Sequence, residues 1–117
     1  MPLTVSSRVE DAFAILELDG SLTLGPSLST LRETARRTMD ESKVAGMILH
    51  VANVTNTDSA GLGELTVVYT LATTRRCPII LVDVSSTLQK MLEVTRLDAL
   101  LPSAVDVASA KKRLKER

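Results

Sequence analysis

The run Asp58-Ser59-Ala60-Gly61-Leu62-Gly63 places a hydroxyl where a loop gives way to a predicted helix. Upstream, residues 47–51 are typical of a short buried strand, and downstream the apolar residues recur at the three-to-four spacing of an amphipathic helix: Leu62, Leu65, Val68, Leu71 and Ala72. A serine at such a junction can cap the helix through its side-chain oxygen or carry a phosphate group.

Nucleophilic catalysis is another use of such a serine, and the sequence disfavours it. The nucleophile elbow of hydrolases reads Gly-x-Ser-x-Gly, whereas Thr57 stands two residues before Ser59, so only half of that turn is present. Asp58 is adjacent to Ser59 and cannot orient the only histidine, His50, toward it in a triad. We therefore expect His50 to be structural and the chain not to be an enzyme.

Metal and cofactor sites are disfavoured as well. One histidine, one cysteine and scattered carboxylates do not repeat at the spacing of metal ligands. Gly61-Leu62-Gly63 lacks the lysine of a phosphate-binding P-loop. Cys77 precedes Pro78 and an apolar run, so we expect a buried, unreactive thiol in spite of the neighbouring arginines.

The remaining chemistry is modification of Ser59 by another enzyme. A phosphate adds about −1.5 to −2 charges at neutral pH, and free N–H groups at a helix start can accept that anion. Gly61 and Gly63 lack side chains, so we expect a partner surface to reach the hydroxyl. The carboxylate of Asp58 would repel the phosphate, and a partner surface would have to remove water from both charges, so modification is expected to change partner binding. The fold is expected to stay intact because the helix start can accept the anion.

Taken alone, however, the motif favours a simple helix cap. Serine is a preferred capping residue, and Asp58 is a second candidate for the same position. Thr55 and Thr57 supply further hydroxyls that a kinase could modify, although hydrogen bonding to the loop backbone is the commoner role of such residues.

Composition limits the partners and the location. With 117 residues, the chain has the length of about one domain, and we expect a single domain over residues 1–117. Fourteen basic and fourteen acidic residues cancel, and the only aromatic side chains are Phe13 and Tyr69, so nucleic acid is not an expected partner. Neither a membrane span nor a signal peptide is recognisable, so we expect a soluble, cytoplasmic protein.

The elements around the motif predict an α/β fold. Strands are expected at 3–6, 12–18, 44–51, 79–82 and 103–105, with Asp19-Gly20 ending the second strand and 52–58 forming a loop. A first helix is expected from Gly25-Pro26 to about residue 41, and a second one begins at Ser59. A third helix is expected from Ser86 to about Val94, with Ser85 as its cap. The last helix is expected to begin after an Asp106 cap and to end in the charged residues 111–117. This order predicts a mixed sheet of about five strands with about four helices packed against it.

The run Ile48-Leu49-His50-Val51, followed by Asp58 to Gly63, resembles the signature of STAS domains, specifically bacterial anti-sigma factor antagonists. Residues 18–23 and the helix from Pro26 resemble the first half of this family, and residues 80–82 and 88–101 resemble the second half. The resemblance therefore covers nearly the whole chain. Two segments depart from the family: polar Asn56-Thr57 stand where apolar residues are usual, and Arg75-Arg76-Cys77 stand where a glycine-containing turn is common.

The resemblance implies a partner-switching protein. Its unphosphorylated form would bind an anti-sigma factor that is also a serine kinase, so that a sigma factor is released. Ser59 matches the phosphorylated serine, the kinase would use ATP and magnesium, and a PP2C-like phosphatase would reverse the modification. The kinase-binding surface would include Asp58, Ser59, Ala60, Gly61, Leu62 and Gly63.

STAS domains also serve as transporter tails, lipid-trafficking subunits and scaffold components of stress-signalling assemblies. The alternative is therefore a non-switching scaffold or subunit in which Ser59 is only a cap.

Overall fold

The computed structural model describes residues 1–116, and the chain begins with a β-hairpin at one edge of a sheet. β1 (Thr4–Glu10) runs antiparallel to β2 (Phe13–Leu22), and the turn residues Asp11 and Ala12 have φ angles of 54° and 70°. Positive φ at both positions gives a two-residue turn whose twist matches that of the strands. We predicted that the first strand ends at residue 6. It continues to Glu10 because an edge strand with a solvent-facing side accommodates polar residues.

Gly20 does not end β2, contrary to the prediction. Its φ angle is +109°, and a Cβ atom at this position would lie 2.3 Å from the carbonyl oxygen of Pro2. The register between β2 and β3 shifts on both sides of this residue, between Glu17 and Asp19 and between Gly20 and Ser21. Glycine therefore allows the strand to bulge and continue to Leu22.

The remaining strands add in parallel, in the order β1-β2-β3-β4-β5. They are β3 (Gly46–Thr57), β4 (Ile79–Val82) and β5 (Ser103–Ala104). Residues 52–57 were predicted as a loop, but Asn53 to Thr57 pair with Asp19 to Leu22. These residues are polar because this end of β3 is largely exposed, and a polar strand is hard to distinguish from a loop in the sequence. The pairing of Thr57 with Leu22 brings Asp58 to the end of β2.

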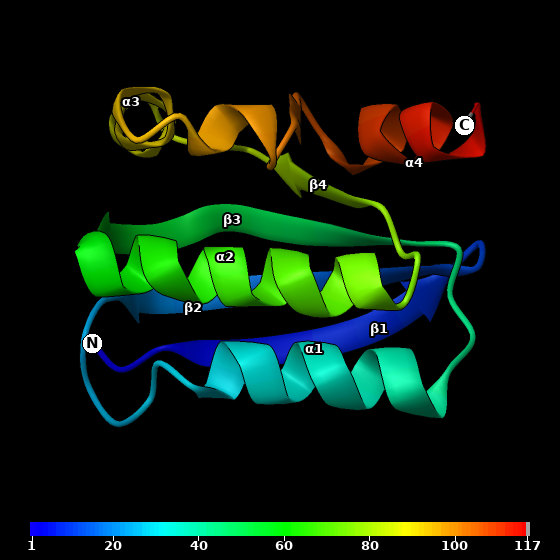
Figure 1. Cartoon of the computed structure of the whole chain (residues 1–117), viewed down its shortest axis with the longest axis horizontal. Coiled ribbons are helices and arrows are strands. Elements are labelled where there is room, and N and C mark those ends of the chain that lie inside the picture. The colour runs from blue at the N-terminus through cyan, green and yellow to red at the C-terminus, as the bar shows by residue number, and fades with distance from the viewer. Residues whose placement is uncertain (117) are drawn as a thin grey trace.

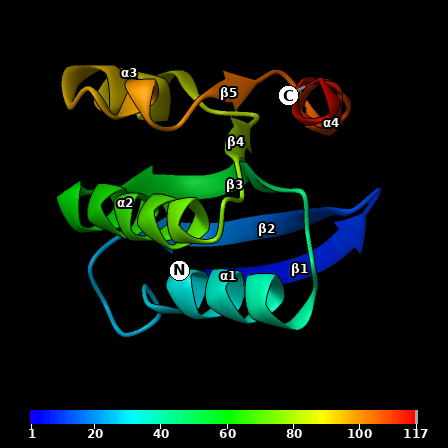
Figure 2. The ribbon, with the colours of Figure 1, turned by 45° about the vertical axis from the view of Figure 1, so that its right-hand side comes forward.

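Helices cover both faces of the sheet. α1 (Thr30–Glu41), α2 (Ser59–Thr74) and α3 (Ser86–Val94) share one core with the sheet, and α4 (Val107–Lys115) packs on the other face. α1 and α2 lie side by side across β1 to β3 (Figure 1), and β5 lies between α3 and α4 (Figure 2). The larger core includes Leu16, Leu31, Leu49, Leu65, Leu81 and Leu92; the smaller one includes Phe13, Ile15, Ile48, Ile80, Ala110 and Leu114.

Most predicted helix boundaries are confirmed. α2 begins at Ser59, Ser85 caps α3 by accepting a hydrogen bond from the Leu88 N–H at 3.1 Å, and Asp106 caps α4. The predicted end of the last helix at Arg117 lies outside the described residues. The predicted α/β class, a mixed sheet of five strands with four helices, is also confirmed.

The first helix begins later than predicted. Residues 25–29 form tight turns, in which the Leu28 N–H donates to Gly25 and the Thr30 N–H donates to Ser27, and α1 starts only at Thr30. The Ser27 hydroxyl accepts a hydrogen bond from the Leu3 N–H at 2.9 Å, which ties this segment to the start of β1. None of the helices within residues 1–116 has both the length and the hydrophobicity that crossing a bilayer requires.

Candidate functional site

Asp58, and not Ser59, caps α2. Its backbone is extended, one carboxylate oxygen accepts a hydrogen bond from the Gly61 N–H at 2.9 Å, and the other accepts one from the Leu24 N–H at 3.1 Å. The hydrogen bonds from Leu24 and Gly61 lower the pKa of Asp58, since they favour the charged carboxylate. Asp58 therefore joins the β2–α1 loop to the start of α2.

Ser59 is the first residue of α2, and its side chain is exposed. Within residues 1–116 its hydroxyl makes no hydrogen bond, so the cap interpretation of Ser59 is wrong. The expectation that free N–H groups at the helix start would accept a phosphate also needs correction, because the Gly61 N–H is already bonded to Asp58. The Ser59 hydroxyl is available for modification, but the helix start has fewer free N–H groups to bind an anion than the sequence predicted.

The two glycines of the motif have different roles. Gly61 is buried, and a Cβ atom there would lie 1.8 Å from the carbonyl oxygen of Leu22. It therefore allows α2 to approach the end of β2, and it does not open the surface to a partner as predicted. Gly63 is exposed, and a Cβ atom there would have no neighbour within 4 Å. Only Gly63 leaves space beside Ser59 for an incoming surface.

An apolar groove of about 470 Å³ runs between α2 and α3, and Ser59 lies on its wall. In Figure 1 the start of α2 lies at the left end of the molecule, with α3 above it and the β2–α1 loop below it. Val94 is 75% exposed at the end of α3, and Leu24 in the β2–α1 loop is 80% exposed. The groove is lined by Ser59, Leu62, Thr87, Lys90, Met91, Val94 and Thr95.

Sequence reasoning identified Ser59 and Leu62 but missed the α3 side of this groove and Leu24. The detectable signal was Val94, an apolar residue at the end of a helix whose inward residues are Leu88 and Leu92. What the sequence could not provide was the position of α3 beside α2, which depends on the pairing of β4 with β3.

The buried carboxylate of Glu64 joins the start of α2 to α1. Glu64 is 2% exposed, and it accepts a hydrogen bond from the backbone N–H of Arg32 at 3.1 Å and from the Arg32 guanidinium at 2.6 Å. These bonds join the first turn of α1 to the second turn of α2. The only sequence signal for this contact was an acidic residue between Leu62 and Leu65 in an otherwise apolar stretch.

His50 lies in a separate polar cluster on the sheet. Its Nδ1 contacts Glu17 on β2, and its Nε2 contacts Asp83 just after β4, each at 2.5 Å. Burial alone would raise the pKa of Glu17, but hydrogen bonds from Arg8 and His50 outweigh it and lower that pKa. Among residues 1–116 no hydrogen bond links His50 to Ser59. The expected structural role of His50 agrees with these contacts.

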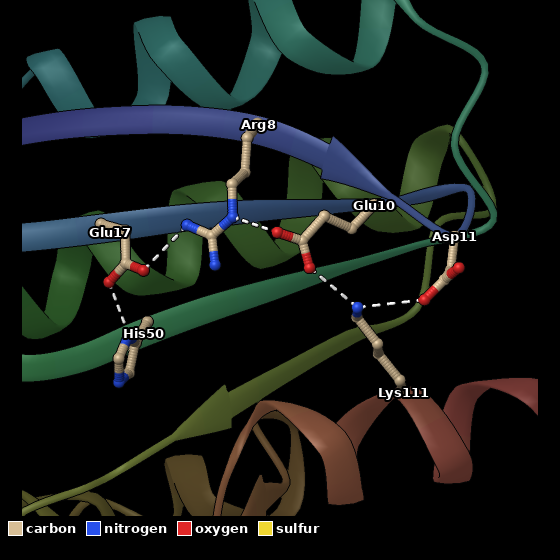
Figure 3. Close-up of polar contacts among 6 residues, drawn as sticks. All are labelled: Arg8, Glu10, Asp11, Glu17, His50 and Lys111. Carbon is tan, nitrogen blue, oxygen red and sulfur yellow. Dashed lines mark hydrogen bonds and ion pairs between the residues drawn. The ribbon is translucent and has the colours of Figure 1, made fainter.

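The same cluster connects the hairpin to α4 (Figure 3). Arg8 bridges Glu10 and Glu17, and Lys111 of α4 bridges Glu10 and Asp11 at 2.8 and 3.1 Å. Hydrogen bonds from Lys111 and Arg8 lower the pKa of Glu10 to about 2. These ion pairs link α4 to the hairpin, but because they are largely exposed each contributes little to stability.

The other candidate side chains do not join Ser59. Cys77 is buried, as predicted, and burial raises the pKa of its thiol to about 11, which disfavours the reactive thiolate. Thr55 and Thr57 belong to β3, and the Thr55 hydroxyl donates to Asn56 at 3.1 Å. In the part of the chain that the structure describes, no three His, Cys, Asp or Glu side chains form a group that could hold a metal ion.

With this geometry established, comparison with known proteins identifies the family. The model of the STAS domain matches residues 4–110. The chain belongs to the STAS domain family. This confirms the resemblance found in the sequence. A comparison with curated protein sequences gave no match.

Several solved structures share this STAS fold. A putative anti-sigma factor antagonist from Thermotoga maritima has a TM-score of 0.78 at 17% identity, covering 95% of this chain and 94% of that one. The anti-sigma factor antagonist SpoIIAA in its unphosphorylated form has a TM-score of 0.72 at 16% identity, covering 98% and 99% of the two chains. The Bacillus protein SpoIIAA has also been solved in its phosphorylated form.

A membrane protein is also similar. The murine Solute Carrier 26 family member A9 anion transporter has a TM-score of 0.80 at 14% identity, covering 99% of this chain and 22% of the transporter. At these identities the similarities concern the fold.

Proposed function

We propose that this STAS domain is an anti-sigma factor antagonist controlled by phosphorylation of Ser59. Its unphosphorylated form binds an anti-sigma factor serine kinase and thereby releases a sigma factor. Phosphorylation of Ser59 weakens that binding, and a PP2C-like phosphatase restores it. The protein acts in the cytoplasm and is the substrate of these enzymes, without a catalytic activity of its own.

The observation that carries this proposal is the free hydroxyl of Ser59 at an apolar groove. Asp58 performs the capping, so the Ser59 side chain has no structural hydrogen bond within residues 1–116. The groove beside it and the exposed Leu24 and Val94 supply apolar surface that a protein partner can bury. The solved anti-sigma factor antagonists of the same fold support this choice of partner.

The effect of phosphorylation follows from charge and desolvation. A partner that covers the groove removes water from the Ser59 hydroxyl, at little cost if the hydroxyl finds a hydrogen bond. A phosphate brings about −1.5 to −2 charges beside the Asp58 carboxylate, and burying both charges in the same interface is costly. The phosphate projects from an exposed side chain, so the fold itself can accept it.

The first experiment identifies the partner and the modified residue. Immobilised wild-type protein should capture an ATP-binding serine kinase from an extract of its own cells, and the captured kinase should inhibit transcription by a sigma factor. Incubation of the purified pair with ATP and magnesium, followed by peptide mass spectrometry, should show one phosphoryl group at Ser59. Modification confined to Thr55 or Thr57 would contradict the proposal.

Two variants provide the controls. Ser59→Ala should bind the kinase and retain it when ATP is added, whereas Ser59→Asp should bind it weakly.

The similarity to an anion transporter's chain favours a second candidate, a non-switching STAS subunit. Capture of a membrane transport complex or a large homomeric scaffold, equally by all three proteins, would favour that candidate.

A further inference from the structure

Lys90 on α3 and Ser59 on α2 line opposite walls of the groove between these helices. Both side chains line the groove, and the other lining residues, Leu62, Thr87, Met91, Val94 and Thr95, are uncharged. Lys90 is exposed on α3, and within residues 1–116 it forms no salt bridge. A flexible lysine thus stands unpaired on the wall opposite the modifiable hydroxyl.

A phosphate on Ser59 would have few partners on α2 itself. The carboxylate of Asp58 already accepts hydrogen bonds from the N–H group of Gly61 in the first turn of α2 and from that of Leu24 in the β2–α1 loop. The same carboxylate is charged at neutral pH and repels a phosphate dianion. A positive charge that could attract the phosphate lies on the opposite wall of the groove, at Lys90. The four-carbon side chain of lysine is flexible, so its ammonium group can adjust its position.

We propose that Lys90 is the receptor for the Ser59 phosphate and that their ion pair spans and narrows the groove. This inference rests on the proposed function, because it concerns the regulation of the same site. The pair would cover apolar lining residues that remain accessible, such as Met91 and Val94. Phosphorylation then opposes partner binding in two ways: it adds charge at the interface, and it occludes the apolar surface.

The test is made on the isolated protein and needs neither the kinase nor the partner. Phosphoserine is installed at position 59 during translation in the wild type, in Lys90→Gln and in Lys112→Gln. Lys112 is an exposed lysine on α4, which packs on the opposite face of the sheet, so its substitution removes the same charge elsewhere. Phosphorus NMR follows the second ionisation of the phosphate as a function of pH.

A nearby ammonium favours the dianion, so Lys90→Gln should raise the midpoint of this ionisation by on the order of half a pH unit. Lys112→Gln should leave the midpoint at its wild-type value. Equal midpoints in the wild type and Lys90→Gln, or equal changes in both variants, would overturn the inference.

The narrowing of the groove has its own readout. The chain has four methionines, and Met91 is the one that lines the groove, so ¹³C-methyl labelling reports on it directly. Phosphorylation should shift the Met91 methyl resonance in the wild type and in Lys112→Gln, and much less in Lys90→Gln. A shift that is undiminished in Lys90→Gln would overturn the inference. Since no partner is present, a failure here is distinct from a failure to find a kinase.

Discussion

Asp58 and Ser59 are adjacent residues with separate tasks. Asp58 holds the Gly61 and Leu24 N–H groups, while the Ser59 side chain points out of the fold without a hydrogen bond within residues 1–116. Sequence reasoning could name both as capping candidates but could not choose between them, because the choice depends on which residue is extended and which is already helical. The structure assigns the cap to Asp58, so Ser59 can be modified without loss of the cap.

This division of tasks predicts different stabilities for two alanine variants. Asp58→Ala removes the cap and the tether to the β2–α1 loop, so its midpoint of thermal unfolding, Tm, should fall by roughly 3–6 °C. Ser59→Ala removes an exposed hydroxyl without a structural bond and should change Tm by less than about 2 °C. Circular dichroism melts of the two variants and the wild type test this. A larger loss in Ser59→Ala than in Asp58→Ala would contradict the assignment of the cap.

The lowered pKa of Asp58 predicts a pH dependence. Hydrogen bonds from Leu24 and Gly61 favour the carboxylate in the folded state, so the folded pKa lies below the ordinary value near 4. The resulting stabilisation is complete above that ordinary value and is lost as the pH falls through the lower folded pKa.

Asp58→Asn keeps a capping side chain but removes the charge. The Tm of the wild type should therefore exceed that of the variant at pH 7, and the difference should shrink as the pH falls below about 4. A difference that stays constant from pH 7 to pH 2.5 would show that the charge of Asp58 contributes nothing.

At the scale of elements, α2 is positioned by contacts at both sides of its first two turns. Gly61 allows the helix to approach the end of β2, and Glu64 binds the start of α1. The sequence correctly predicted α2, β4 and the caps of α3 and α4, because apolar spacing and capping residues are local signals. It misplaced the end of β2 and the end of β3, because pairing between distant segments extends polar strands that look like loops.

The contrast between the two glycines gives a prediction for α2. Gly61→Ala would place a Cβ atom 1.8 Å from the Leu22 carbonyl oxygen, so the helix must move, and the free energy of unfolding should fall by at least about 2 kcal/mol. Gly63→Ala meets no neighbour within 4 Å and replaces glycine in a helix, so it should raise that free energy by up to about 1 kcal/mol. Urea unfolding monitored by circular dichroism measures both. Equal effects of the two substitutions would contradict the close approach of α2 to β2.

At the scale of the whole molecule, the α2–α3 groove and the polar cluster around His50 lie on opposite faces of the sheet. The features proposed to face a partner, which are Ser59, the α2–α3 groove and Leu24, lie near the point where β3 brings Asp58 to the end of β2. The polar cluster around His50 and the α4 core lie on the other face of the sheet. Sequence similarity predicted the STAS fold and the serine, but the groove required the placement of α3 beside α2, which no local pattern encodes.

Modification of Ser59 is proposed to change binding while the fold stays intact. The most direct measurement compares the wild type with protein carrying phosphoserine at position 59, by calorimetric titration against the captured anti-sigma factor kinase and by thermal unfolding. The phosphorylated form should bind at least about tenfold more weakly, equivalent to about 1.4 kcal/mol, with Tm changed by less than about 2 °C. Equal affinities of the two forms, or a weaker affinity that accompanies loss of cooperative unfolding, would contradict it.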